Sequence, residues 1–197
     1  IDYETTLEAH NQRWLLALDA PTGLTPETAL NGTLTVALRE PLTERQRFRL
    51  AASLDYRFNT TENPAAIRRN LLLPPGSNPQ TRALAEQWRV IGSGPEAIVT
   101  KALALFAADF TYTLRPPLLG RDGIDEFLFR SKRGFCEHYA AAFVVLMRAA
   151  GIPARVVGGY QGGEFNPLDG YLVVRQSDAH AWAEVWLAGQ GWVRVDP

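Results

Sequence analysis

The sequence has little of what would indicate disulfides, nucleic-acid binding or a membrane span. It contains one cysteine, which excludes an internal disulfide and leaves the redox compartment open. Its 20 basic and 21 acidic residues nearly cancel and provide no electrostatic footprint for nucleic acid. No apolar run approaches the roughly 20 residues that span a bilayer, and the opening IDYETTLEAH lacks the pattern of a signal peptide. We therefore expect no nucleic-acid partner, and membrane attachment only through segments outside this fragment.

The composition is that of a globular protein. Hydrophobic residues make up 46% of the 197 residues and charged residues 21%, which is enough apolar surface for one substantial core or two small ones. The final WVRVDP has the alternation of a strand that stops in mid-fold, and we expect the fold to be truncated at the C-terminus.

Residues 1–58 are predicted to form a β-rich N-terminal region. Segments with strand character are separated by turn signals at Pro21-Thr22-Gly23 and Asn31-Gly32. These segments are YETTLEA, RWLLALDA, TLTVALRE and RFRLAASLDYRF. The pattern indicates a small antiparallel β unit.

Residues 59–94 are predicted to be a connector that runs over the surface. They are rich in Asn, Pro, Gly and Arg and contain two short helical patterns, AAIRRNLL and TRALAEQWRV. At its end, Ser93 is a capping residue, Pro95 suits a first helical turn and Glu96 is an early acid. The run EAIVTKALALFAADF then has apolar residues at helical spacing, which predicts a helix of about four turns. These apolar residues are Ile98, Ala102, Leu105 and Phe106.

The segment CEHYAAAFVVLMRAAG is predicted to be a second helix, ended by its glycine. Gly134 gives the chain freedom to turn just before it, and Cys136 falls in its first turn. The unpaired N–H groups and the macrodipole at that end favour an anion, so a thiolate should form more easily there than in free cysteine. An apolar stripe of Ala140, Phe143 and Met147 follows Cys136 and must face the core. The sulfur is therefore expected to point inward.

His138 is the nearest histidine in sequence, but it is not expected to act with the thiol. Residues two apart on a helix point about 200° away from each other, so His138 is interpreted as a surface or supporting residue. The same geometry disfavours a Cys-x-His metal pair, and no second thiol exists to complete a soft metal site. We expect no metal and no cofactor.

Four strand-like segments follow this helix. ARVVGGY and YLVVRQ flank the polar loop QGGEFNPLDG and are predicted to pair as a hairpin with a long connection. AHAWAEVWL alternates strictly, and WVRVDP does so after a turn at AGQG. His180 and Asp196 would then be neighbours on adjacent strands. The parts for a nucleophile, a general base and an orienting acid are thus Cys136, His180 and Asp196.

Each of these three residues has a structural explanation when it is taken by itself. A lone cysteine is often a small hydrophobe, a histidine can hydrogen-bond within a core, and an aspartate can cap a turn. The three together, in this order and on these elements, favour a catalytic site.

Three blocks of the sequence resemble the bacterial transglutaminase-like proteins, which share the papain-like cysteine fold. They are GFCEHYAAAFVVLMRAAGIPARVVGGY, DAHAWAEVW and GWVRVDP, and they match the family's Gly-x-Cys before a helix, its histidine beside an aromatic residue and its Asp-Pro after a strand. The resemblance covers residues 95–197 and implies an α+β core, in which the helix that carries the cysteine packs on an antiparallel sheet. It implies that Cys136 is the nucleophile, His180 the base and Asp196 the third member.

Within the family the chain is similar to the periplasmic domain of TgpA-type inner-membrane proteins, which implies a place at the periplasmic face of the inner membrane. The implied activity is acyl transfer through a thioester, with a glutamine of a protein or peptide as acyl donor, an amine as acceptor and the cell envelope as the source of substrates. Hydrolysis of an amide or peptide by the same triad stays open, because water can replace the amine. A non-catalytic binding module with a silent site stays open as well.

Overall fold

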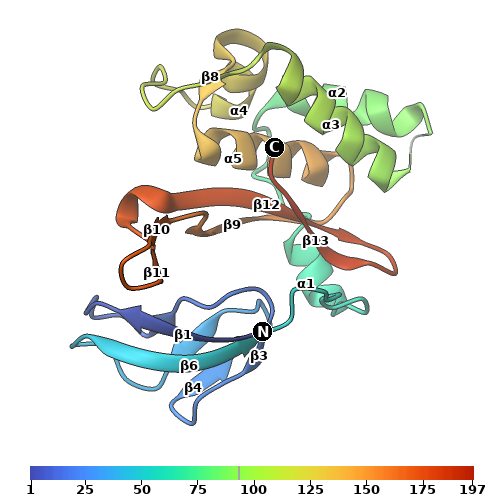
Figure 1. Ribbon diagram of the computed structural model, residues 1–197. Coiled ribbons are helices and arrows are strands. Elements are labelled where there is room, and N and C mark those ends of the chain that lie inside the picture. The colour runs from blue at the N-terminus through green and yellow to red at the C-terminus, as the bar shows by residue number, and fades with distance from the viewer. Residues whose placement is uncertain (93) are drawn as a thin grey trace. The chain divides into compact units, whose positions relative to one another are not determined.

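The computed structural model describes residues 1–92 and 94–197 and divides into two compact units, Ile1–Tyr56 and Arg57–Pro197 (Figure 1). The first unit is built from strands and loops, whereas the second combines helices with a sheet. The fold is therefore of the α+β class, as the sequence predicts. None of the helices in the described residues is both long and apolar enough to cross a membrane.

Residues 1–56, all of which are described, form two antiparallel sheets in the strand orders β1-β6-β3 and β2-β5-β4. The strands are β1 (Asp2–Leu7), β2 (Trp14–Leu15), β3 (Pro21–Gly23), β4 (Thr28–Leu30), β5 (Val36–Leu38) and β6 (Gln46–Ala52). Buried apolar side chains give this unit a small core of its own, made of Leu15, Val36, Leu38, Leu42, Phe48 and Leu50. The predicted antiparallel β unit is confirmed.

The details of this unit differ from the prediction at two places. Pro21-Thr22-Gly23, predicted as a turn, is strand β3 at the edge of its sheet, where it pairs with β6. Proline is tolerated on an edge strand because its missing N–H can lie on the unpaired side. The predicted strand RWLLALDA is much shorter, since its paired part is Trp14–Leu15.

In the second unit, helix α5 packs against one face of the sheet β13-β12-β9, and α2, α3 and α4 lie on the same side of this sheet (Figure 1). Its helices are α1 (Pro64–Arg69), α2 (Pro79–Val90), α3 (Pro95–Asp109), α4 (Gly123–Glu126), the π-helix η1 (Phe127–Ser131), α5 (Cys136–Ala149) and the 3₁₀ turn η2 (Gln176–Asp178). Its strands are β7 (Thr111–Tyr112), β8 (Arg133–Gly134), β9 (Ala154–Tyr160), β10 (Glu164–Asn166), β11 (Tyr171–Val173), β12 (Ala179–Leu187) and β13 (Gly191–Val195).

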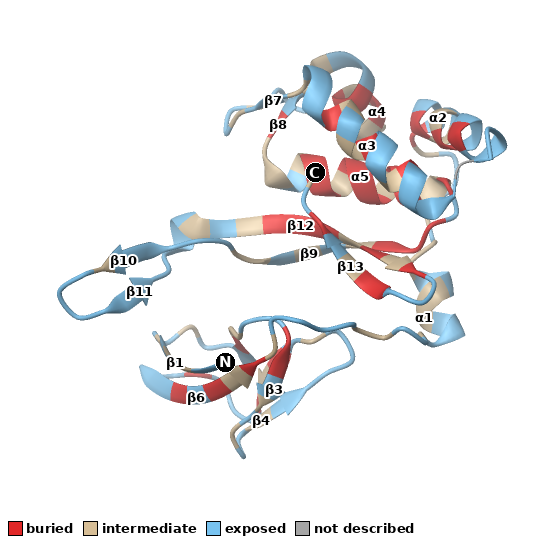
Figure 2. Cartoon of the chain, turned by 45° about the vertical axis from the view of Figure 1, so that its right-hand side comes forward, coloured by how far each residue is buried: buried red, intermediate tan, exposed pale blue. Residues whose placement is uncertain are grey.

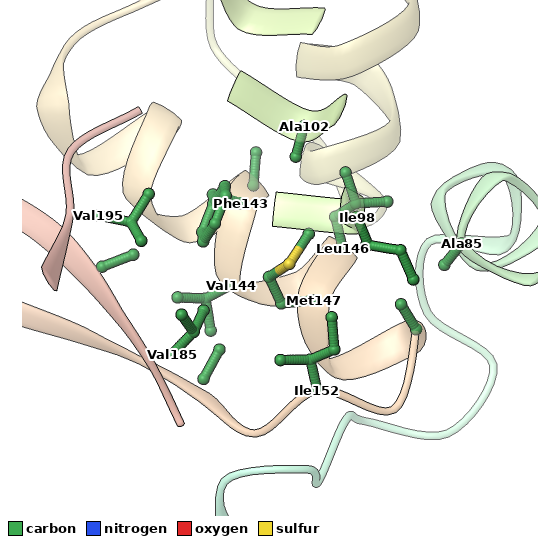
Figure 3. Packing of buried hydrophobic residues seen from close by; sticks show 14 of the residues in the cluster. Ala85, Ile98, Ala102, Phe143, Val144, Leu146, Met147, Ile152, Val185 and Val195 are labelled. Atoms are coloured by element: carbon green, nitrogen blue, oxygen red, sulfur yellow. The ribbon is translucent and has the colours of Figure 1, made fainter. Parts of the chain in front are cut away.

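Helix α5 is the centre of this unit, between the sheet and the helices α2, α3 and α4. The predicted stripe is confirmed, because Ala140, Phe143 and Met147 have no exposed surface. On the sheet, Ala183 and Val185 of β12 are equally buried and belong to one cluster with Phe143 and Met147. Figure 2 shows α5 and the middle of β12 as buried, and Figure 3 shows how the side chains meet. This core fixes where α5 begins and how it is rotated.

Helix α3 matches the predicted helix and contributes to the same core. It begins at Pro95, in the first helical position, with Glu96 in the first turn. Ile98, Ala102 and Phe106 are buried as predicted. The predicted capping residue, Ser93, lies outside the described residues.

Helix α2 shows that residues 59–94 are not simply a surface connector. Two of its side chains, Ala85 and Trp88, are buried and join the core around α5. The helical pattern of this segment was predicted, but the burial of one face was not. A short amphipathic pattern indicates that a helix has an apolar face without showing which partner covers it.

The start of α2 is tied to α4 by a buried carboxylate. Asp125 is 3% exposed and accepts hydrogen bonds from the N–H of Gln80 and of Thr81, each at 2.8 Å, and from the Thr81 hydroxyl at 2.6 Å. In return, the side-chain oxygen of Asn78 accepts from the N–H of Ile124 and of Asp125. Each helix thus caps the other, and the N–H groups that a helix start leaves unpaired are satisfied.

The predicted hairpin between residues 154–160 and 171–176 is wrong. Strand β9 pairs instead with β12, with Gly159 opposite His180, while β10 and β11 form a separate hairpin. The long apolar face of β12 requires a central place in the sheet, whereas Leu172 and Val173 of β11 are exposed. At Gly159 an added Cβ would lie 2.6 Å from the Trp182 ring, so glycine allows the indole to lie against β9.

We expect Asp125→Ala to lower the free energy of unfolding by about 2–4 kcal/mol, because it leaves buried N–H groups without their charged acceptor. Chemical denaturation measures this loss. Asp109→Ala is the control, since Asp109 is a largely exposed carboxylate paired with Lys132 at 3.2 Å and should cost only about 0–1 kcal/mol. Equal losses for the two variants would contradict the capping role of Asp125.

Candidate active site

Cys136 is the first residue of α5 and is partly exposed, as a reachable thiol at a helix start should be. The chain reaches it through β8, which pairs in parallel with β7 so that Gly134 lies opposite Tyr112. A Cβ added to Gly134 would lie 2.6 Å from the Cβ of His138 and 2.9 Å from the Phe127 ring. Glycine therefore allows the chain to pass close to His138 and Phe127 just before the helix begins.

The backbone N–H of Cys136 has no carbonyl acceptor within its own helix, as is general for the first helical residues. It donates instead to the hydroxyl oxygen of Tyr112, at 3.4 Å. Unpaired N–H groups and the helix dipole make this end of α5 favourable for negative charge. The placement of Cys136 in the first helical turn is confirmed.

His180 and Asp196 lie together, as the alternation of their two strands predicts. His180 is near the start of β12, and Asp196 follows the last residue of β13. The Nε2 atom of His180 is 2.9 Å and 3.0 Å from the two carboxylate oxygens of Asp196. Since the carboxylate binds Nε2, Nδ1 is the ring nitrogen that is left to serve a nucleophile.

Arg194 completes the surroundings of this pair, and sequence reasoning did not single it out. Its Nη2 atom is 3.4 Å from Asp196 and 3.2 Å from the side-chain oxygen of Gln161. Its guanidinium lies over the Trp182 ring at 4.0 Å, and that ring is 6.2 Å from the ring of His180. The alternation of WVRVDP could have indicated this neighbour, because it places Trp192, Arg194 and Asp196 on one face of the strand.

Tyr112 connects the two parts of the site, and it too was missed from sequence. Burial is the main cause that raises the pKa of its hydroxyl above the ordinary value. The hydrogen bond from the N–H of Cys136 lowers this pKa. The side chain of Cys136 and the negative charge of Asp196 raise it further. Cys136 and Asp196 are thus both near enough to Tyr112 to change the pKa of its hydroxyl. The start of α5 and the end of β13 therefore lie in the same part of the unit.

His138 has a supporting place at the start of α5. It is half-buried, its ring packs against Phe135 at 4.6 Å and Phe127 at 5.8 Å, and its Nδ1 accepts from the N–H of Phe135 at 3.5 Å. This agrees with its interpretation as a supporting residue. Among residues 1–92 and 94–197, no group of three or more His, Cys, Asp or Glu side chains could hold a metal ion.

The chain matches two families of known proteins. Residues 82–197 match the transglutaminase-like superfamily, and residues 1–59 match the TgpA N-terminal domain. A protein-glutamine gamma-glutamyltransferase of Pseudomonas aeruginosa is 44% identical over 196 residues, which are 99% of this chain and 29% of that protein. The uncharacterized protein YebA of Bacillus subtilis is 42% identical over 95 residues, or 45% of this chain and 13% of YebA. The chain thus spans less than a third of these relatives.

Solved structures give the same result. The periplasmic domain of TgpA from Pseudomonas aeruginosa, bound to ethylmercury, superposes with a TM-score of 0.96 at 44% identity, covering 100% of this chain and 71% of that chain. A protein from Cytophaga hutchinsonii, at 16% identity and a TM-score of 0.53, shares the fold. The α+β core expected from the resemblance, with a β-rich region before it, is confirmed. This chain belongs to the transglutaminase-like superfamily.

Proposed function

We propose that this chain is a cysteine-dependent acyltransferase in which Cys136 is the nucleophile, His180 the general base and Asp196 the residue that orients the histidine. The observation that carries the proposal is the pairing of Asp196 with Nε2 of His180, in the same locality as a cysteine at a helix start. A nucleophile, a base and an orienting acid are the parts that acyl transfer through a covalent intermediate requires.

The acylation step converts a glutamine side chain into a thioester. Nδ1 of His180 takes the thiol proton, and the sulfur of Cys136 attacks the carboxamide carbon. As the tetrahedral intermediate collapses, the C–N bond breaks and the imidazolium returns the proton to the departing ammonia. The second step reverses these roles, because His180 then deprotonates an amine, which attacks the thioester and forms an isopeptide bond.

Asp196 serves this sequence by fixing the tautomer of His180. With the Nε2 proton held by the carboxylate, Nδ1 carries a lone pair that can accept the thiol proton. The same carboxylate stabilises the imidazolium once it forms. The contacts of Arg194 with Asp196, Gln161 and the Trp182 ring hold the carboxylate in this orientation.

We infer substrate and location from the relatives. The Pseudomonas relative is named a protein-glutamine gamma-glutamyltransferase, and the solved TgpA domain is periplasmic. On this basis we propose that the chain acts in the periplasm, where it joins a glutamine of a cell-envelope protein to a primary amine.

Hydrolysis by the same route is the second candidate, because water can reach the site. The side chains of His180 and Asp196 are 21% and 34% exposed. The outcome would then depend on whether an amine or water reaches the thioester first.

We expect Cys136→Ala to abolish the incorporation of a labelled primary amine into a glutamine-containing protein, because the thioester cannot form without the sulfur. Label incorporation and ammonia release are followed in parallel for the wild type and the variant. Ammonia or new chain ends without incorporation would move the assignment to hydrolysis. No difference between wild type and variant across several substrates would favour a non-catalytic binding module.

Asp196→Ala should lower kcat by about 10²–10⁴-fold, since no carboxylate then holds the required tautomer of His180 or stabilises the imidazolium. The rate of amine incorporation under saturating substrate measures this loss. The matched control is Asp109→Ala, which removes a largely exposed carboxylate from an ion pair and should leave kcat unchanged. Retention of wild-type kcat by Asp196→Ala would rule out the orienting role.

A further inference from the structure

The hydroxyl of Tyr112 lies next to the place where a substrate oxygen would be needed. An attacked carbonyl carbon bonds to the sulfur of Cys136, so its oxygen must find donors next to that residue. The backbone N–H of Cys136 is the donor at the helix start, and it points at the Tyr112 hydroxyl at 3.4 Å. The Cys136 thiol is also close enough to this hydroxyl to raise its pKa. The phenol therefore lies beside the backbone donor and beside the nucleophile.

The backbone around Tyr112 is fixed relative to Cys136. Strand β7 pairs with β8, the two residues of which come just before the helix. The N–H of Thr111 donates to the carbonyl of Lys132 at 2.8 Å, and the N–H of Thr113 donates to the carbonyl of Gly134 at 2.7 Å. The Tyr112 ring stacks on the buried Tyr139 at 6.1 Å. These contacts hold the phenol at the start of α5.

Tyr112 is nevertheless open to a substrate. The residue as a whole is 59% exposed, although its hydroxyl is partly desolvated, and its bond to the Cys136 N–H is long for a hydrogen bond. A carbonyl oxygen that arrives with the substrate can replace the phenol oxygen as the acceptor of this N–H at little cost. The contact with the N–H uses only a lone pair of the hydroxyl, so the O–H proton can be donated to the new oxygen.

We propose that Tyr112 is the second donor of the oxyanion hole, together with the backbone N–H of Cys136. This inference rests on the proposed function, since it assigns a residue to the same acylation step. As the sulfur–carbon bond forms, the electron pair of the carbonyl π bond moves to the oxygen, which accepts from the Cys136 N–H and the Tyr112 O–H. The phenol keeps its proton throughout, and both hydrogen bonds strengthen as the oxygen becomes charged.

The electrostatics of the site agree with a donor role. Burial and the neighbouring Cys136 and Asp196 groups raise the pKa of Tyr112, so the phenol stays protonated through neutral pH. A protonated phenol is a donor to an anion, whereas a phenolate would repel the negative charge that develops on the substrate.

The test is Tyr112→Phe, which removes the hydroxyl and retains the ring that stacks on Tyr139. Acylation is measured as kcat for ammonia release from a glutamine peptide. The reactivity of the thiol itself is measured as the rate of Cys136 alkylation by iodoacetamide, a displacement that creates no oxyanion. Tyr171→Phe is the control, because Tyr171 is an exposed tyrosine on the β10–β11 hairpin.

We expect Tyr112→Phe to lower kcat by about 10–10³-fold, with KM and the alkylation rate changed less than about threefold, because the lost bond exists mainly in the transition state. A kcat equal to or above that of the wild type would overturn the proposal, because the hydroxyl would then have no role in the reaction or would block the site. An equal fall in alkylation would overturn it too, since the hydroxyl would then act on the thiol.

The results that would contradict acyl transfer differ from those that would contradict the role of Tyr112. If Cys136→Ala keeps the activity of the wild type, the proposed acyl-transfer function is wrong. If Cys136→Ala is inactive while Tyr112→Phe is fully active, acyl transfer stands and the assignment of Tyr112 is wrong. Thermal unfolding of Tyr112→Phe, expected to match that of Tyr171→Phe, separates a loss of the donor from a loss of the fold.

Discussion

Helix α5 is held on one side by the sheet β13-β12-β9 and on the other by α2, α3 and α4. Phe143, Leu146 and Met147 are completely buried along it, and a close-packed core resists rotation or sliding of such a helix. The position of Cys136 at its first residue follows from this packing. Because the backbone N–H of Cys136 belongs to the same helix start, the core also determines where this donor lies for a reacting oxygen.

The second half of the site depends on strand register. With Ala183 opposite Val195 in the β12–β13 pair, the two strand ends bring His180 within hydrogen-bond distance of Asp196. A shift of one residue would turn these side chains to the other face. The site is thus built from a helix end and a sheet, both rigid elements, and Tyr112 on the short strand β7 lies close to both.

Local periodicity was enough to predict α5, α3 and the two strands that carry His180 and Asp196. In each of these elements the burial pattern repeats along the sequence and thereby shows which face meets the core. The partners of β9 and α2 could not be predicted in this way. A local pattern shows that an element has an apolar face, but it does not show which element, distant in sequence, covers that face. Tyr112 and Arg194 were missed for a related reason. The contacts of Tyr112 are with residues distant in sequence, and Arg194 contacts the Trp182 ring of the neighbouring strand.

The central claim is that Cys136 forms a thioester with the acyl donor. The most direct measurement is the intact mass of the protein after acid quenching of a reaction with a glutamine peptide in the absence of any added amine. The account predicts an adduct with the mass of the peptide less ammonia, located on Cys136 by digestion and lost on addition of a primary amine. Turnover of the peptide without an adduct, or an adduct on another residue, would contradict it.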